Sequence, residues 1–253
     1  MKIMEIRDLH YSYGPLSVLK GVDMDFYKGT FYGILGPNGC GKSTLLKNLY
    51  GYLKPSKGSI TLSGKNIRNM NPRERARNIA YVPQDSHVGF DFSVLDVIAM
   101  GRNPYHSALD NLGSADIAQI EKAMRETSTE HLRNKSINEL SGGEKQRALI
   151  ARAFAQDSDI ILMDEPLKGL DIKLKLNLIR IFSRMWQTDK RTVVFVTHDV
   201  DEALLLGSDI IVLSRPPAQI ILKKRIDLPY EKRSLESEYL KKLEQDLMAA
   251  LGN

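Results

Sequence analysis

The glycine-rich segment at residues 36–44, Gly-Pro-Asn-Gly-Cys-Gly-Lys-Ser-Thr, has the residue types and the spacing needed to bind phosphate. It fits the pattern Gly, four residues, Gly-Lys-Ser of a phosphate loop. Its glycines let backbone N–H groups turn inward around phosphate oxygens. Lys42 can reach the β- and γ-phosphates of a nucleotide, and the Ser43 hydroxyl can ligate Mg²⁺. The alternative is a glycine turn that happens to precede Lys-Ser.

Two adjacent acids form a second candidate site. Asp164 and Glu165 follow the apolar run at residues 160–163, which predicts a buried strand that ends at a polar site. Asp164 can hold Mg²⁺ through its water shell, and Glu165 can polarise an attacking water. The alternative is a pair of acids in an exposed loop.

A second glycine-rich helix start lies at residues 140–144, Leu-Ser-Gly-Gly-Glu. Ser141 can cap the helix and donate a hydrogen bond, so the same physics predicts a second anion-binding site. The alternative is a simple helix cap. Two adjacent glycines at a helix start normally reduce stability, which argues against that alternative.

Three weaker candidates follow or lie between predicted strands. The amide of Gln84 could reach a metal or a water, although a surface polar residue is the alternative. His198 could hydrogen-bond a γ-phosphate or orient Glu165. Tyr11 or Tyr13, between the first two strands, could stack on a purine ring, and the alternative is edge packing in a small sheet.

The elements that must position these residues alternate between strands and helices. The predicted strands are residues 4–9, 22–26, 31–35, 59–62, 79–84, 160–163, 192–196, 210–213 and 220–222. The predicted helices are residues 44–49, 72–78, 94–102, 114–133, 144–155 and 172–186. Residues 85–153 are mostly helical, which indicates a helical insert within an α/β domain. The tail at 231–251 carries an apolar stripe at helical spacing, typical of a docking face: Leu235, Tyr239, Leu243, Leu247 and Leu251.

Composition sets broad limits. A chain of 253 residues is long enough for one large core or two unequal lobes. The formal net charge of +5 fits a nucleotide binder near anionic lipid but is too weak to indicate nucleic acid. Cys40 is the only cysteine, so no internal disulfide forms, and we expect a reducing compartment. We expect neither a signal peptide nor a membrane-spanning segment.

In this order the motifs resemble those of the ATP-binding-cassette ATPases, over essentially the whole chain. The most specific match is residues 140–147, which are similar to that family's signature sequence. The resemblance implies that Tyr13 stacks on adenine and that Gln84 senses Mg²⁺ and the transmembrane partner. It also implies that Glu165 is the general base and His198 the switch histidine.

The resemblance assigns further residues to ATP and Mg²⁺. Those implied for ATP are Tyr13, Gly36, Asn38, Gly39, Cys40, Gly41, Lys42, Ser43, Thr44, Ser141, Gly142, Gly143, Glu144 and Asp171. Those implied for Mg²⁺ are Ser43, Gln84 and Asp164, and those implied for catalysis are Glu165, His198 and Gln84.

The implied fold is α/β: a P-loop NTPase (RecA-like) core with an antiparallel β subdomain and an inserted α-helical subdomain. We expect the first part of the core with the β subdomain at 1–88 and the helical subdomain with the signature at 89–153. The second part of the core is expected at 154–225, and a C-terminal helical tail at 226–253.

The resemblance also implies partners. Two copies pack head to tail, so that each ATP lies between one copy's phosphate loop and the other copy's Ser141, Gly142 and Gly143. Integral membrane permease subunits place the protein at the cytoplasmic face of the membrane, and an extracytoplasmic substrate-binding protein takes part indirectly. Nucleic acid is not an expected partner.

The cargo is indicated by two short stretches that disagree. Residues 92–105 are similar to ATPases of iron-siderophore, haem and cobalamin importers, and we give this stretch more weight. Residues 213–217 and 226–229 look more like the nitrate, sulfonate and taurine group. A soluble cassette of the iron–sulfur assembly type is a further alternative. One departure is Lys168, which stands where the family usually carries a small polar residue in a loop that crosses the dimer interface.

Overall fold

The computed structural model describes residues 1–84, 91–107 and 110–252. The strands are β1 (Lys2–Tyr13), β2 (Leu16–Tyr27), β3 (Phe31–Leu35), β4 (Lys57–Leu62), β5 (Lys65–Asn66), β6 (Ile79–Val82), β7 (Ile160–Asp164), β8 (Thr192–Thr197), β9 (Asp209–Leu213) and β10 (Ile220–Arg225). The α-helices are α1 (Lys42–Leu49), α2 (Pro72–Asn78), α3 (Val94–Ala99), α4 (Ser114–Glu126), α5 (Gly142–Ala155), α6 (Ile172–Asp189), α7 (Val200–Leu206) and α8 (Glu238–Leu251). Short 3-10 helices lie at Ile67–Asn69, Met100–Tyr105, Glu130–Leu132, Ile137–Glu139 and Tyr230–Lys232.

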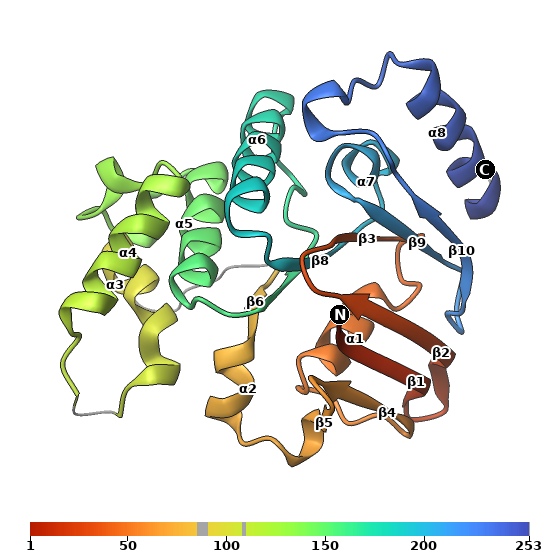
Figure 1. The fold of residues 1–253 in the computed structure, drawn as a ribbon, viewed down its shortest axis with the longest axis horizontal. Coiled ribbons are helices and arrows are strands. Elements are labelled where there is room, and N and C mark those ends of the chain that lie inside the picture. The colour runs from red at the N-terminus through yellow and green to blue at the C-terminus, as the bar shows by residue number, and fades with distance from the viewer. Residues whose placement is uncertain (85–90, 108–109, 253) are drawn as a thin grey trace.

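A six-stranded sheet in the order β10-β9-β3-β8-β7-β6 forms the centre of the molecule (Figure 1). Strands β9, β3, β8, β7 and β6 are parallel, and only β10 is antiparallel to its neighbour. Strands β3, β7 and β8 are buried along their whole length, which explains their continuous apolar runs. In this register Leu35 pairs with Thr197, and Asp164 with Val196. The residues that follow β3, β7 and β8 therefore meet at one edge of the sheet.

A second, four-stranded sheet of order β2-β1-β4-β5 is antiparallel and contains the N-terminal residues. Its first strands run further than predicted, so Tyr11 and Tyr13 lie on β1 rather than between strands. Strand β4 begins at Lys57, two residues before its predicted start. Gly58 makes this possible, because a Cβ there would lie 2.2 Å from the carbonyl oxygen of Asp8.

Helices α3, α4 and α5 share one hydrophobic core with α6 and with one face of the six-stranded sheet (Figure 1). The helix predicted at 114–133 ends at Glu126, because Ser128 takes a φ of 54° and the Thr127 hydroxyl donates to the Ala123 carbonyl oxygen. The helix predicted at 94–102 changes to a 3-10 turn after Ala99. The expected boundary between residues 88 and 89 lies outside the described residues, and the division into domains remains a prediction.

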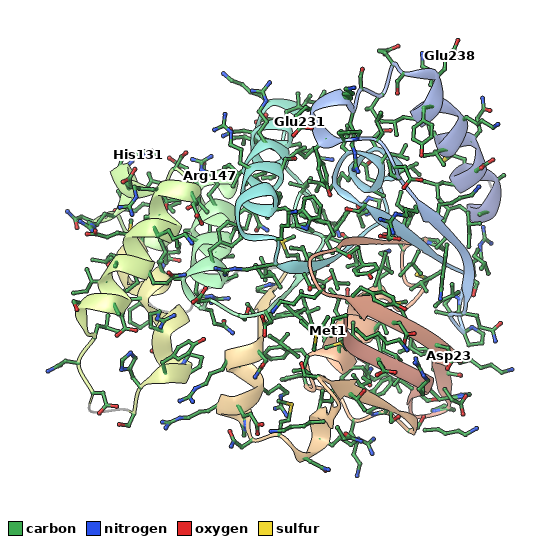
Figure 2. All side chains as sticks on the ribbon, in the orientation of Figure 1. Met1, Asp23, His131, Arg147, Glu231 and Glu238 are labelled. Atoms are coloured by element: carbon green, nitrogen blue, oxygen red, sulfur yellow. The ribbon has the colours of Figure 1, made fainter. Side chains whose placement is uncertain are left out.

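The C-terminal helix α8 packs on the protein's own core. It begins at Glu238, seven residues after the start of the tail in which the stripe was predicted, because Ser237 caps it; Glu238 is exposed at this end (Figure 2). Leu240 and Leu247 are fully buried against β9 and α7, whereas Tyr239 is 43% exposed. The inclusion of Tyr239 in the docking stripe was therefore wrong, and Leu240 takes its place. Within 1–84, 91–107 and 110–252, no helix has the length and apolarity needed to span a bilayer.

This packing predicts the effect of truncating the buried stripe of α8. We expect Leu247→Ala to lower the free energy of unfolding by about 2–5 kcal/mol, because it leaves a cavity in a fully buried site. The matched control is Met248→Ala on the exposed face of the same helix, which we expect to change stability by about 0.5 kcal/mol or less. Urea unfolding followed by circular dichroism measures both. Equal losses in the two variants would contradict the docking of α8 through Leu247.

Candidate active site

The phosphate loop connects β3 to α1 and is closed around its own lysine. Helix α1 begins at Lys42, two residues before the predicted start, so the N–H groups of Lys42 and Ser43 lie in its first turn. Gly41 has a φ of 110°, and a Cβ there would lie 2.8 Å from a Val18 methyl carbon. The Lys42 ammonium donates to the carbonyl oxygens of Gly36 at 2.8 Å and of residue 37 at 3.1 Å. The loop thus has the curved backbone and the cation that phosphate binding requires.

Asp164, the last residue of β7, lies against this loop. Its Oδ1 accepts a hydrogen bond from the Ser43 hydroxyl at 2.8 Å, and its Oδ2 accepts one from the Tyr81 hydroxyl at 3.1 Å. The side chain is only 4% exposed. Burial raises the pKa of Asp164 and outweighs the two hydrogen bonds, which lower it. A hydroxyl and a carboxylate at this spacing are oxygen ligands of the kind that Mg²⁺ takes, with water and phosphate oxygens completing its shell.

Tyr81 was missed by sequence reasoning. It lies on β6, next to β7 in the sheet, where it pairs with Leu162. Burial raises its pKa, so its hydroxyl keeps the proton that it donates to Asp164. A signal was available, since a tyrosine near the end of a strand parallel to the acid-bearing strand can reach that acid. Using this signal requires the strand order, which the sequence pattern alone does not provide.

Glu165 lies in the turn after β7, with a backbone φ of 45°. Its Oε1 lies 3.3 Å from Nδ1 of His198 and 3.9 Å from Nζ of Lys42, and its Oε2 lies 2.9 Å from Nζ of Lys168. Burial raises the pKa of Glu165, but the Lys168 ammonium and the nearby His198 hold that pKa below its ordinary value. Glu165 is therefore ionised near neutral pH and chemically able to accept a proton from water.

The turn after β8 presents His198 to Glu165. The Thr197 hydroxyl donates to Glu202 at 2.7 Å, and the Asp199 N–H donates back to the Thr197 hydroxyl at 3.0 Å. Lys175 of α6 forms two ion pairs with this turn, with Nζ 2.6 Å from the Glu202 carboxylate and 3.2 Å from the Asp199 carboxylate. Sequence patterns do not predict these supports, because the supports join residues of β8, α6 and α7.

The glycine-rich start of α5 forms a complete helix cap. Ser141 and Glu144 exchange hydrogen bonds in a capping box, with the Ser141 hydroxyl 2.6 Å from the Glu144 carboxylate. A Cβ on Gly143 would lie 2.6 Å from a Leu174 methyl carbon, so this glycine permits close packing on α6. Gly142 faces open space. Figure 1 shows α5 and α1 in different parts of the molecule.

The structure joins five of the predicted residues by direct contacts: Lys42, Ser43, Asp164, Glu165 and His198. Gln84, Asp171 and Tyr13 are not part of this set of contacts. Gln84 follows β6 at the same edge of the sheet and is half-buried, and Asp171 caps α6 through the Leu174 N–H. Tyr13 is 47% exposed at the end of β1. Its ring packs edge-on against the Tyr11 ring, with the two ring centroids 4.9 Å apart.

Cys40 contributes only its backbone to the phosphate-binding face of the loop. Its thiol is fully buried and would lie 2.7 Å from a Cβ on Gly36, so the side chain packs behind the loop. Burial raises the pKa of this thiol. Asn38, Gly39 and Thr44 belong to the same segment, residues 36–44. Their contacts with ATP remain a prediction.

Comparison with known proteins identifies the family. A sequence profile of the ABC transporter family matches residues 19–168, more than half of the 253 residues. The chain belongs to the ABC transporter family. The predicted P-loop NTPase fold is thereby confirmed, and the chain is an ABC ATPase.

Curated relatives match over most of their length. The petrobactin import ATP-binding protein FpuD of Bacillus anthracis is 34% identical over 84% of this chain and 78% of its own. The ferric enterobactin transport ATP-binding protein FepC of Escherichia coli is 33% identical over 90% of this chain and 86% of its own. The zinc uptake ATP-binding protein ZnuC of Bacillus subtilis is 34% identical over 85% and 92%.

Solved structures agree with this result. An inward-facing structure described as a metal-chelate type ABC transporter has 29% identity and a TM-score of 0.76, over 87% of this chain and 83% of that chain. A dimeric bacterial ABC transporter cassette has 26% identity and a TM-score of 0.76, over 88% and 98%. That cassette is also known as a dimer bound to ADP and phosphate.

Proposed function

We propose that this chain hydrolyses ATP to drive an importer of a metal chelate, of the iron-siderophore, haem or cobalamin type, through a separate membrane permease. One observation carries the proposal. The buried end of β7 places Asp164 within 2.8 Å of Ser43 and places Glu165 beside Lys42 of the phosphate loop. This is the arrangement in which a phosphate-bound metal and a water-activating base lie on either side of a terminal phosphate.

Each residue then has a defined task. Ser43 and Asp164 would hold Mg²⁺, which would neutralise charge on the β- and γ-phosphates when bound. Lys42 leaves its carbonyl partners and binds the same phosphates. Glu165 accepts a proton from water as the water oxygen bonds to the γ-phosphorus and the bond to the bridging oxygen breaks. The products are ADP and inorganic phosphate, and His198 keeps Oε1 of Glu165 in place.

A second copy completes the site. The free face of Gly142 and the N–H groups at the start of α5 suit a γ-phosphate, and they lie apart from this chain's own α1. In a head-to-tail dimer these groups cover the ATP of the partner. Tyr13 stacks on adenine, Gln84 senses Mg²⁺, and Asp171 contacts the nucleotide. The dimeric relative supports this arrangement. ATP then joins the two copies and hydrolysis releases them, which is a ligand-driven population shift.

The relatives are the basis for the proposed membrane partner and cargo. Their names give petrobactin, ferric enterobactin and zinc as cargo, and the inward-facing neighbour is described as metal-chelate type. These support a chelate or metal importer over the nitrate and sulfonate group and over a soluble iron–sulfur assembly cassette. The protein then works at the cytoplasmic face of the membrane, bound to permease subunits, with an extracytoplasmic binding protein delivering the cargo.

The Glu165→Gln variant tests the hydrolytic site and the dimer together. We expect ATP turnover to fall by about a hundredfold or more, because the amide cannot accept the proton. MgATP binding should persist, so the variant should form a dimer measurable by light scattering after gel filtration. The matched controls are the same variant with MgADP and a Lys42→Ala variant with MgATP, both expected to be monomeric. A Glu165→Gln protein that stays monomeric at saturating MgATP contradicts the proposal.

The transport role has its own test. The tagged protein, purified in mild detergent from the cells that encode it, should bring down a chain with many apolar spans long enough to cross a bilayer, each about 20 residues. The untagged strain is the control. Recovery of only soluble partners would leave the ATPase intact and would contradict the importer role.

A further inference from the structure

Lys168 makes an ion pair with the proposed general base inside the same chain. Its Nζ lies 2.9 Å from Oε2 of Glu165, whereas the other oxygen of that carboxylate faces His198 and Lys42. The two oxygens therefore have different partners. Oε1 points to the groups that meet the nucleotide, and Oε2 points to the loop that follows.

The loop is built to hold this contact. The Lys168 N–H donates to the Glu165 carbonyl oxygen at 3.1 Å, which forms a tight turn. Leu167 is fully buried in the core, and Asp171 caps α6, so the loop is fixed on both sides of Lys168. The Lys168 side chain is 47% exposed and reaches from the surface to a carboxylate that is 7% exposed.

Arrival of ATP changes the charges around Glu165. Lys42, which lies 3.9 Å from Oε1, is drawn to the phosphates, and the γ-phosphate brings additional negative charge toward the same carboxylate. A buried carboxylate that loses a cation and gains an anionic neighbour opposes binding. Lys168 contacts Oε2, whereas Lys42 and His198 lie at Oε1, so Lys168 can stay in place during this exchange.

We propose that Lys168 is a positioning residue that holds Oε2 of Glu165 and compensates its charge, and so strengthens binding of nucleotides that carry a γ-phosphate. This inference rests on the proposed function and extends it to a residue outside the matching motifs. Lys168 acts through Glu165 and needs no contact with the nucleotide itself. Its contribution should therefore depend on the charge of Glu165 and on the presence of a γ-phosphate.

The test is a double-mutant cycle between Lys168→Met and Glu165→Gln. Affinities for the non-hydrolysable analogue MgAMP-PNP and for MgADP are measured by calorimetry, at a protein concentration where light scattering gives a monomer. In the wild-type background we expect Lys168→Met to weaken the affinity for MgAMP-PNP about fivefold, which is the size of the effect of a partly exposed ion pair. The affinity for MgADP should weaken by less than about twofold. In the Glu165→Gln background the effect on MgAMP-PNP should vanish, because no carboxylate charge remains.

Two further variants separate this role from a structural one. Lys168→Arg keeps the charge and should restore MgAMP-PNP affinity to within about twofold. Lys173→Met removes a charge from the exposed first turn of α6, and it should leave both affinities unchanged.

The same measurements can overturn the inference. Equal weakening by Lys168→Met in both backgrounds would mean that Lys168 contacts the phosphate directly or only shapes the loop. An equal loss of affinity for MgAMP-PNP and for MgADP would mean that the γ-phosphate is not involved. A wild-type chain that binds neither nucleotide would refute the proposed function as well, and this result is distinct from the other two.

Discussion

Two buried carboxylates at the end of strand β7 bring the segments of the candidate site together. Asp164 and Glu165 are 4% and 7% exposed, and a buried carboxylate is costly unless hydrogen bonds and cations satisfy it. Their partners come from the phosphate loop, the neighbouring strand β6, the turn after β8 and Lys168 in the loop that follows Glu165. The parallel register of β3, β8 and β7 brings these segments to one edge of the sheet. Satisfying the two acids therefore links the central sheet to the loop that binds phosphate.

The groups that should bind MgATP are engaged with one another in this structure. Lys42 contacts two backbone carbonyl oxygens of its own loop, and Ser43 contacts Asp164. Under the proposed function, binding of MgATP would exchange these internal contacts for contacts to phosphate and metal. The surrounding supports, Tyr81 on Asp164 and Lys168 on Glu165, lie on the far oxygens of the two carboxylates. This separation allows the near groups to move while the acids stay in place.

The sequence predicts the centre of this site well, because its chemistry depends on local order. A phosphate loop lies between an apolar strand and a helix, and two acids end another apolar strand, so both can be recognised without knowing the topology. The fully buried strands β3, β7 and β8 were found for the same reason. Helix ends were less certain, since the end at Glu126 depends on a single residue with positive φ, Ser128.

The parts that could not be predicted are contacts between side chains brought together by folding. The hydrogen bond from Tyr81 to Asp164 requires the order of the strands, and the ion pairs of Lys175 require the packing of α6 on the β8 turn. The pair between Lys168 and Glu165 is close in sequence, yet it depends on the positive φ of Glu165, which no residue pattern indicates. Sequence reasoning placed Lys168 at an interface and did not identify its partner.

We expect each nucleotide site to be divided between two copies of this chain. The most direct measurement is an experimental structure of the Glu165→Gln variant with MgATP. We expect ATP on the phosphate loop, Mg²⁺ between Ser43 and Asp164, and the Ser141–Gly143 helix start of a second copy on the γ-phosphate. ATP bound to a single chain, with the α5 start of every copy facing solvent, would contradict this expectation.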